Sequence, residues 1–196
     1  MTSPSDPSRF DDRYYDRFYG PDGAHDDTRV AHLATAVHSM ATWWGVDIRS
    51  VLDVGAGMGM WRDWYLRNHL GVRVRSTDVS PHACATWSHE QRDIAIWRPR
   101  VRFDLVVCHS VLQYIPDDAI ERAVRHLVAA TGAVLYLEVP TVRDFRDVID
   151  VQRTDMSVYL RTGERYRELL STELAQAGAG LWVRPDVVPL YELEGA

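Results

Sequence analysis

The sequence predicts a single doubly wound (Rossmann-like) α/β fold: a mostly parallel seven-stranded sheet with helices on both faces and an antiparallel edge strand. Three observations support this prediction. β-type and helical patterns alternate along the whole chain, the apolar run 51–54 enters a loop with glycine at 55, 57 and 59, and Asp78 closes the next β-type run. In such sheets a glycine loop and an acid meet at the carboxyl edge of the strands, where nucleotide-like ligands bind.

The composition is that of one globular domain. The 196 residues are 46% hydrophobic and 26% charged, and the net charge of −6 disfavours nucleic acid as a partner. No apolar run is long enough to span a bilayer, the N-terminus lacks the features of a signal peptide, and Cys84 and Cys108 are the only cysteines. We therefore expect a cytoplasmic monomer or homodimer that binds neither membrane nor nucleic acid.

We divide the chain into an N-terminal arm, 1–27, and a domain, 28–196. The arm begins with a Ser/Pro/Asp-rich stretch, 1–9, which is typical of disorder. An aromatic cluster follows, closed by Gly-Pro-Asp-Gly at 20–23; its members are Phe10, Tyr14, Tyr15, Phe18 and Tyr19. The cluster either packs on the domain as a short amphipathic segment or closes over a bound ligand as a flap, and these two interpretations are compatible.

The first elements of the domain surround the glycine loop. Apolar residues at helical spacing predict a helix over 28–44, with Asp27 or Thr28 as its N-cap. The strand at 50–54 precedes the loop, and a helix at 58–69 follows it. These elements place the loop at the start of a helix, where free backbone N–H groups face a ligand.

The next elements continue the alternation. An alternating strand, 72–77, leads to Asp78, and Pro81 stands near the first position of a helix that runs to about residue 88. Three more strands are expected, at 90–94, 103–108 and 133–139.

The C-terminal part is less regular. Asp117 and Asp118 open a helix that runs to about residue 130 and that Gly132 closes. We leave 141–162 unassigned and expect three further elements, a helix at 163–177 and an antiparallel edge pair formed by 180–183 and 187–193.

The glycine loop and Asp78 form the first chemical pattern. Asp78 follows Gly55 by about two dozen residues, the position of an acid that accepts hydrogen bonds from both hydroxyls of a ribose. A helix-capping aspartate is the simpler alternative. Nicotinamide dinucleotides give the same pairing, but their fingerprint has glycine at the sixth position, where this chain has Met60.

These motifs resemble those of the class I S-adenosylmethionine-dependent methyltransferases over most of 28–140. The run 51–59 resembles the first motif with its acid at Asp53, and 77–80 resembles the second. Residues 92–94 resemble the third motif, and 103–108 with 111–115 resemble the fourth strand and its turn. Many small-molecule members have one or two histidines where this chain has Gln113 and Tyr114, so no role of those histidines is transferred.

The resemblance implies S-adenosylmethionine as cofactor. It implies that Asp78 binds the ribose, that Asp93 meets the adenine amino group, and that Asp53 meets the amino-acid end. The full expected cofactor set is Asp53, Gly55, Ala56, Gly57, Met60, Trp61, Asp78, Val79, Asp93, Ile94, Cys108 and Tyr15.

Two residues are candidates for the base that receives the acceptor's proton. His109 follows the fourth parallel strand directly, and an imidazole is partly available as a base at neutral pH. Glu138, near the end of the fifth strand, is the second candidate. A packing histidine and a solvated carboxylate are the structural alternatives.

The acceptor-binding residues are expected in 141–167 and in the arm. The candidates are Tyr14, Tyr19, Tyr159, Arg161 and Tyr166. Tyr14 and Tyr19 belong to the possible flap, Tyr159 and Tyr166 could stack on a ring, and Arg161 could hold an anionic group. The charges of this stretch also fit a solvated face. No histidine has ligand spacing with carboxylates, so we expect no dedicated metal site, and a magnesium ion held by scattered carboxylates stays open.

The predicted function is methylation of a small molecule, with O-methylation of a sugar or aromatic hydroxyl slightly preferred over N-methylation. A non-catalytic, S-adenosylmethionine-binding partner or regulatory subunit is the alternative. Met60 disfavours a nicotinamide-dependent oxidoreductase, and the run 107–110 lacks the Asp/Asn-Pro-Pro-aromatic tetrad of nucleic-acid amine methylation.

Overall fold

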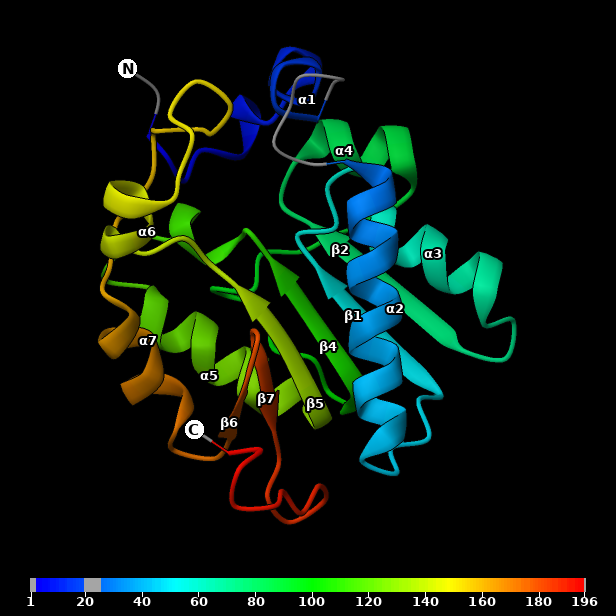
Figure 1. Cartoon of the computed structure of the whole chain (residues 1–196). Helices are drawn as coiled ribbons and strands as arrows, with labels where there is room; N and C mark the ends of the chain where they lie inside the picture. The colour runs from blue at the N-terminus through cyan, green and yellow to red at the C-terminus, as the bar shows by residue number, and fades with distance from the viewer. Residues whose placement is uncertain (1–2, 20–25, 196) are drawn as a thin grey trace.

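The computed structural model describes residues 3–19 and 26–195, and one seven-stranded sheet forms its centre (Figure 1). The strand order is β3-β2-β1-β4-β5-β7-β6. The pairs of β7 with β5 and with β6 are antiparallel, and the other pairs are parallel. The strands are β1 (Ser50–Val54), β2 (Arg73–Asp78), β3 (Glu90–Gln91), β4 (Phe103–His109), β5 (Thr131–Glu138), β6 (Ala175–Gly178) and β7 (Leu181–Val183). The predicted fold class is confirmed.

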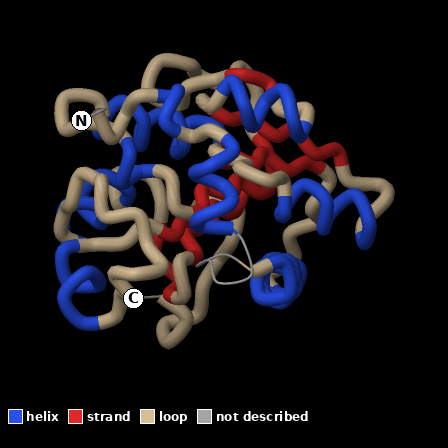
Figure 2. The backbone as a smooth tube through the Cα atoms, turned by 90° about the horizontal axis from the view of Figure 1, so that it is seen from above, coloured by secondary structure: helices blue, strands red, loops and turns tan. Residues whose placement is uncertain are grey.

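Helices cover both faces of the sheet, as the view from above shows (Figure 2). The α-helices are α1 (Asp12–Tyr19), α2 (Asp27–Trp43), α3 (Met60–Asn68), α4 (Pro81–Trp87), α5 (Ile120–Ala130), α6 (Val142–Asp147) and α7 (Gly163–Leu170). Two 3₁₀ helices, η1 (Pro7–Arg9) and η2 (Leu112–Tyr114), lie in connections.

The two hydrophobic cores follow from strand alternation. On β4, Leu105 and Val107 face the core under α2 and α3, whereas Val106 and Cys108 face the core that contains α5 and α7. Successive side chains of a strand point to opposite faces, so a strand covered on both sides is apolar throughout. Burial of this double layer fixes the carboxyl edge that carries the site.

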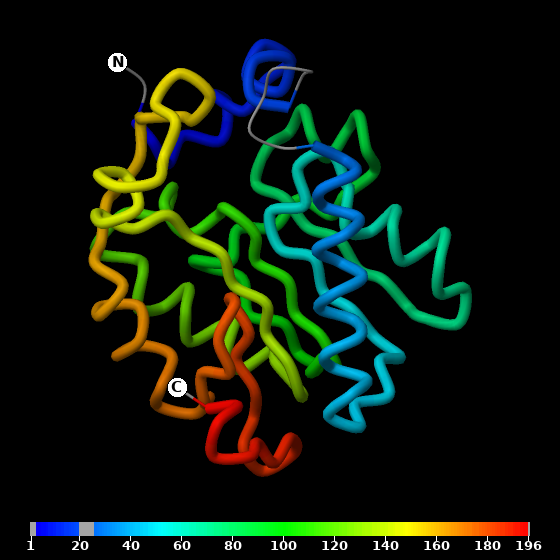
Figure 3. The backbone as a smooth tube through the Cα atoms, viewed as in Figure 1, coloured from blue at the N-terminus to red at the C-terminus, as the bar shows by residue number. Residues whose placement is uncertain are grey.

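Strand register brings distant residues to that edge. Val54 lies opposite Thr77 of β2 and Cys108 of β4, and His109 lies opposite Glu138 of β5. The glycine loop, Asp78 and the β4 and β5 termini are therefore neighbours. The arm and the segment around 150–160 also lie at this end of the sheet (Figure 3).

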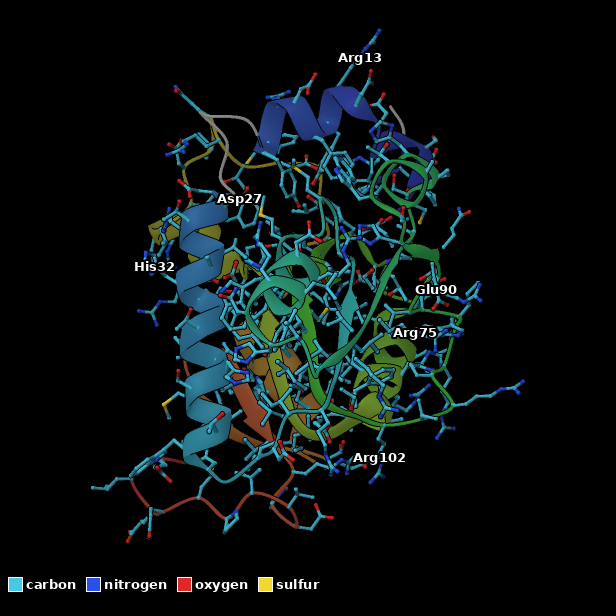
Figure 4. The ribbon with its side chains drawn as sticks, turned by 90° about the vertical axis from the view of Figure 1, so that its right-hand side faces the viewer. Arg13, Asp27, His32, Arg75, Glu90 and Arg102 are labelled. Atoms are coloured by element: carbon cyan, nitrogen blue, oxygen red, sulfur yellow. The ribbon has the colours of Figure 1, made fainter. Side chains whose placement is uncertain are left out.

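The edge strand next to β2, which is β3, is very short. The third strand was expected over 90–94 but contains two residues, because the Asp93 side chain accepts a hydrogen bond from Ala95 N and starts a turn. Arg75 and Glu90 lie side by side there (Figure 4) and form a two-point ion pair at 2.8 and 2.6 Å. Short, charged edges of this kind oppose pairing with another sheet.

Two helix boundaries differ from the prediction. Asp26, rather than Asp27 or Thr28, caps α2, because its carboxylate accepts from two backbone N–H groups of the first turn. The second boundary concerns α5, which begins at Ile120 and not at Asp117 or Asp118, and which Gly132 does not close. Gly132 lies within β5, where a Cβ would come within 2.7 Å of Phe103 O. Glycine at this position therefore allows β5 to approach β4 closely.

The helix predicted over 163–177 begins at Gly163 but is shorter than predicted, and the pairing of 180–183 with 187–193 was wrong. The helix ends at Leu170, and β6 pairs with β7 through a tight turn with positive φ at residues 178, 179 and 180. Pairing with β7 outweighs the helical propensity of this segment. Pro189 interrupts the other expected strand and has no N–H for a ladder.

Two α-helices, α1 and α6, were not assigned from the sequence. In α6, the Thr141 hydroxyl and the Asp144 carboxylate form a capping box with each other's backbone N–H groups. This pattern is local and could have been recognised. The proposed turn at 20–23 lies outside the described residues. No helix in the described ranges is long and apolar enough to cross a membrane.

Candidate active site

The glycine loop takes a conformation that side chains would oppose. Gly55, Gly57 and Gly59 all have positive φ, and a Cβ on Gly55 would come within 2.3 Å of a Val111 methyl group. Backbone hydrogen bonds from Gly55 N and Ala56 N to Thr77 O, 2.8 and 2.9 Å long, tie the loop to β2. The loop thus leads directly into α3 at the edge of the sheet.

Asp78 is buried beneath this loop. One carboxylate oxygen accepts from Gly57 N at 2.9 Å and the other accepts from Ser80 N at 2.8 Å. Burial raises the pKa of Asp78, and these backbone hydrogen bonds oppose the shift. A carboxylate has about four lone-pair sites, so Asp78 retains capacity for two hydroxyl donors.

Asp53 is the least satisfied acid of the site. It is 2% exposed, and its Oδ2 atom has no hydrogen-bond partner in the part of the chain that the structure describes. Burial raises the pKa of Asp53 to about 7. A buried carboxyl group with an unpaired oxygen fits a ligand that brings a cationic group.

A small cleft of about 100 Å³ lies over the loop. Seven of the twelve expected cofactor residues line it, namely Tyr15, Gly55, Gly57, Asp78, Val79, Asp93 and Ile94. Asp53 lies behind them, Ala56 belongs to the loop, Met60 and Trp61 pack in the core under α2 and α3, and Cys108 packs in the opposite core.

The aromatic arm covers this cleft. Phe10, Tyr14, Tyr15 and Tyr19 line it, and the Tyr19 hydroxyl lies 3.3 Å from where a Cβ of Gly57 would stand. Ser80 Oγ donates to Phe10 O at 2.6 Å and anchors the arm on α4. Ligand pockets usually measure about 300–1,000 Å³, so the arm has to move before a nucleoside can enter.

A second cavity, of about 560 Å³, adjoins the first. Its walls come from α1, α2, the ends of β4 and β5, α6 and the segment that follows α6. Tyr14, Ser110 and Tyr114 line both cavities, and the two tyrosine hydroxyls are 2.9 Å apart. These three residues form the boundary between the two spaces.

His109 and Glu138 meet at the wall of the larger cavity. Trp61 Nε1 donates to His109 Nδ1 at 3.1 Å, and His109 Nε2 lies 3.3 Å from Glu138 Oε2. Because an indole nitrogen only donates, Nδ1 is the acceptor and Nε2 carries the proton that faces Glu138. The lone pair of His109 therefore points toward buried Trp61 and away from an acceptor.

Glu138 presents the carboxylate of this pair to the cavity. Its side chain is 50% exposed, and Tyr136 and Ser110 hydroxyls also donate to it, at 3.2 and 3.3 Å. Burial alone acts to raise the pKa of Glu138, but hydrogen bonds, first of all from His109, hold it at about 2. The geometry favours Glu138 over His109 as the group that receives an acceptor's hydrogen.

Three expected substrate residues lie outside both cavity walls. Arg161 is buried and uses its guanidinium internally, donating to Leu112 O at 3.1 Å and to Asp117 at 2.8 Å. Tyr166 is buried and its hydroxyl accepts from Arg161, while Tyr159 contacts Ser3. Arg161 thus fixes the connection between β4 and α5, which corrects its expected role of holding an anion.

Other wall residues were not expected. Ser110 takes positive φ, 57°, which is rare for a residue with a Cβ. Gln113 and Tyr114 of η2, and Arg29 and Leu33 of α2, also line the larger cavity. Nothing in the sequence pairs α2 with η2, because their approach depends on the whole sheet. In the two described ranges no group of three or more metal-binding side chains comes together.

Comparisons with known proteins agree with this geometry. A family model described as a methyltransferase domain matches residues 24–180. A search of curated proteins found no match.

Several solved structures share the fold at low sequence identity. Magnesium protoporphyrin IX methyltransferase from Synechocystis, with bound S-adenosylmethionine, is 17% identical at a TM-score of 0.58, covering 94% of this chain and 100% of its own. The sugar N-methyltransferase from Streptoalloteichus is 17% identical at a TM-score of 0.61, and the match covers 77% of this chain and 85% of that protein. An amino pentose methyltransferase from Micromonospora echinaspora is 16% identical at a TM-score of 0.62, and the match covers 82% of this chain and 92% of that protein.

Proposed function

This chain belongs to the methyltransferase-domain family, and from that premise we propose that it methylates a small molecule with S-adenosylmethionine as cofactor. One observation carries the proposal: the cleft over the glycine loop and the 560 Å³ cavity share the wall formed by Tyr14, Ser110 and Tyr114. A cofactor bound in the first space would face an acceptor in the second.

The residues of the cleft fit this cofactor. Asp78 would hold the ribose hydroxyls with its remaining lone pairs, and Asp53 would meet the ammonium group with its unpaired oxygen. Asp93 and Ile94 would line the adenine side, and Tyr15 would cover it. When bound, the cofactor supplies an electrophilic methyl group on a sulfonium centre.

On the acceptor side, Glu138 would accept a hydrogen bond from the attacking group and orient it. His109 holds Glu138 by donating from Nε2, and Trp61 holds His109. We prefer a hydroxyl acceptor, on a sugar or aromatic ring, because a hydroxyl has to give up its proton as it attacks, and the Glu138 carboxylate would receive that proton. Orientation of two bound groups is worth up to roughly 7–11 kcal/mol in well-held cases.

Three measurements test this proposal. Calorimetry should show that S-adenosylhomocysteine binds and that NAD does not. A screen of small hydroxyl and amine acceptors, with mass-spectrometric detection of S-adenosylhomocysteine, should then give a methylated product. A non-catalytic binding partner would bind S-adenosylhomocysteine yet give no product with any acceptor, and tighter binding of NAD would exclude the cofactor assignment.

A further inference from the structure

Gln113 carries an unsatisfied acceptor at the wall of the larger cavity. The residue is 4% exposed, and its Oε1 atom has no hydrogen-bond partner among residues 3–19 and 26–195. Its Nε2 atom donates to Ser110 O at 2.9 Å, which fixes the orientation of the amide. Most buried polar side-chain atoms in folded proteins have a partner, so a donor group of a ligand would complete the hydrogen bonding of this oxygen.

Glu138 lies on the same wall and is joined to Gln113 through one residue. Ser110 O accepts from Gln113, Ser110 Oγ donates to Glu138 Oε1 at 3.3 Å, and Ser110 N donates to the Glu138 carbonyl at 2.9 Å. Ser110 holds this arrangement with a positive φ that a residue with a Cβ rarely adopts. Ser110 thus hydrogen-bonds to both residues, and all three residues line the larger cavity.

The chemistry of these two groups defines their ligand. The ionised Glu138 carboxylate and the Gln113 amide oxygen both accept hydrogen bonds, while the Gln113 amide nitrogen gives one of its two N–H groups to Ser110 O. A ligand with one hydroxyl would satisfy Glu138 and leave Gln113 unpaired. A ligand with two adjacent donors would satisfy both.

We propose, resting on the proposed function, that Gln113 is a specificity-determining residue that selects acceptors with a second hydrogen-bond donor next to the methylated hydroxyl. The substrate class is a vicinal diol on a ring. Glu138 would receive the hydroxyl that is methylated, and Gln113 Oε1 would receive its neighbour.

Matched pairs of probes test the proposal by binding. The probes are trans-1,2-cyclohexanediol against cyclohexanol, and catechol against phenol, titrated by ligand-observed NMR with and without S-adenosylhomocysteine. A neutral hydrogen bond corresponds to a preference of roughly tenfold at most. We expect each diol to bind several-fold to tenfold more tightly than its mono-ol. Equal binding of the paired probes, or no binding of any of them, overturns the proposal.

The variant Gln113→Met keeps side-chain length and removes both polar atoms. It should abolish the diol preference and leave the affinity for the mono-ols unchanged, whereas a merely structural role would lower the melting temperature and keep the preference. Gln113→Glu keeps acceptor oxygens at this position and should retain the preference in part. Gln152→Met makes the same change at an exposed position outside the cavity and should have no effect.

The outcomes separate this proposal from the proposed function. Absence of S-adenosylhomocysteine binding contradicts the cofactor assignment, while the probe preference of the free protein still tests Gln113. A diol preference that persists in Gln113→Met contradicts the Gln113 assignment even if methyl transfer is observed.

Discussion

The two halves of the site shift the pKa values of their acidic side chains in opposite directions. On the cofactor side, burial raises the pKa values of Asp53, to about 7, and of Asp78. On the acceptor side, three donors hold the pKa of Glu138 at about 2 although burial opposes them. An ammonium group of a ligand would therefore add positive charge beside Asp53 in the cofactor half, whereas in the acceptor half groups of the chain already stabilise the charge of Glu138.

The halves also differ in how the chain builds them. The cofactor cleft uses the loops that follow β1, β2 and β3, held by backbone hydrogen bonds, and the arm covers it. The acceptor cavity joins segments that are far apart in sequence, from α1 to residue 158, through side-chain hydrogen bonds. The negative charge of the site is therefore balanced by the ligand on the cofactor side and by groups of the protein on the acceptor side.

The largest expected effect concerns the acceptor side. Glu138→Gln keeps the shape of the side chain and removes the charge, so kcat should fall by about 10²–10⁴-fold while S-adenosylhomocysteine affinity stays the same. Because the pKa of Glu138 is about 2, protonation of this carboxylate should not lower the wild-type kcat between pH 5 and 8. A steady-state pH profile checks this.

His109→Gln is the companion variant for that test. It removes the imidazole that holds Glu138 and should have a smaller effect on kcat than Glu138→Gln. A larger loss of kcat in His109→Gln than in Glu138→Gln would identify His109 as the base and reverse the comparison.

The next effect concerns Asp78 on the cofactor side. Asp78→Ala removes two charge-assisted hydrogen bonds to a ribose, each worth about 1.5–3 kcal/mol. Affinity for S-adenosylhomocysteine should fall by about one to three orders of magnitude in calorimetry. The variant also removes the partner of Gly57 N, so thermal unfolding must confirm that it is folded. An unchanged dissociation constant in a folded variant would exclude the ribose role.

A pH-dependent effect should distinguish Asp53 from Glu138. With its pKa raised to about 7, Asp53 is protonated in the free protein below that pH and has to lose its proton to pair with an ammonium group. Affinity for S-adenosylhomocysteine should therefore rise by up to about tenfold per unit from pH 5 to 7 and level off above. Proton release, measured by calorimetry in buffers of different ionisation enthalpy, should accompany binding. Asp53→Asn should remove both, and a flat wild-type profile would contradict this assignment.

The smallest expected effect concerns the arm. Because Tyr19 lies against Gly57 and has to move before a nucleoside enters, Tyr19→Ala should speed S-adenosylhomocysteine association a few-fold in stopped-flow tryptophan fluorescence. Phe18→Ala changes an aromatic residue of the same helix that lines only the acceptor cavity, and it should leave the association rate unchanged. Equal rates for Tyr19→Ala and the wild type would show that the arm does not limit entry.

The elements of the cofactor half could be predicted from the sequence, because they are local in the chain. The strand–glycine loop–helix pattern spans few residues, and positive φ at its three glycines follows from short-range sterics. The fold class was predicted for the same reason, because alternation of apolar strands and amphipathic helices is a local signal. Local propensity failed at 163–177 and 187–193, where strand pairing and proline decided the outcome.

Only the tertiary structure decided the acceptor half. His109 and Glu138 were recognised as candidates, but the choice between them depends on Trp61 of α3, which donates to Nδ1 of His109 at the end of β4. The unpaired oxygen of Gln113 and the burial of Arg161 likewise depend on segments brought together across the sheet. The physical reason is that hydrogen-bond partners are set by spatial proximity, and at this edge proximity comes from sheet order and register rather than from neighbours along the chain.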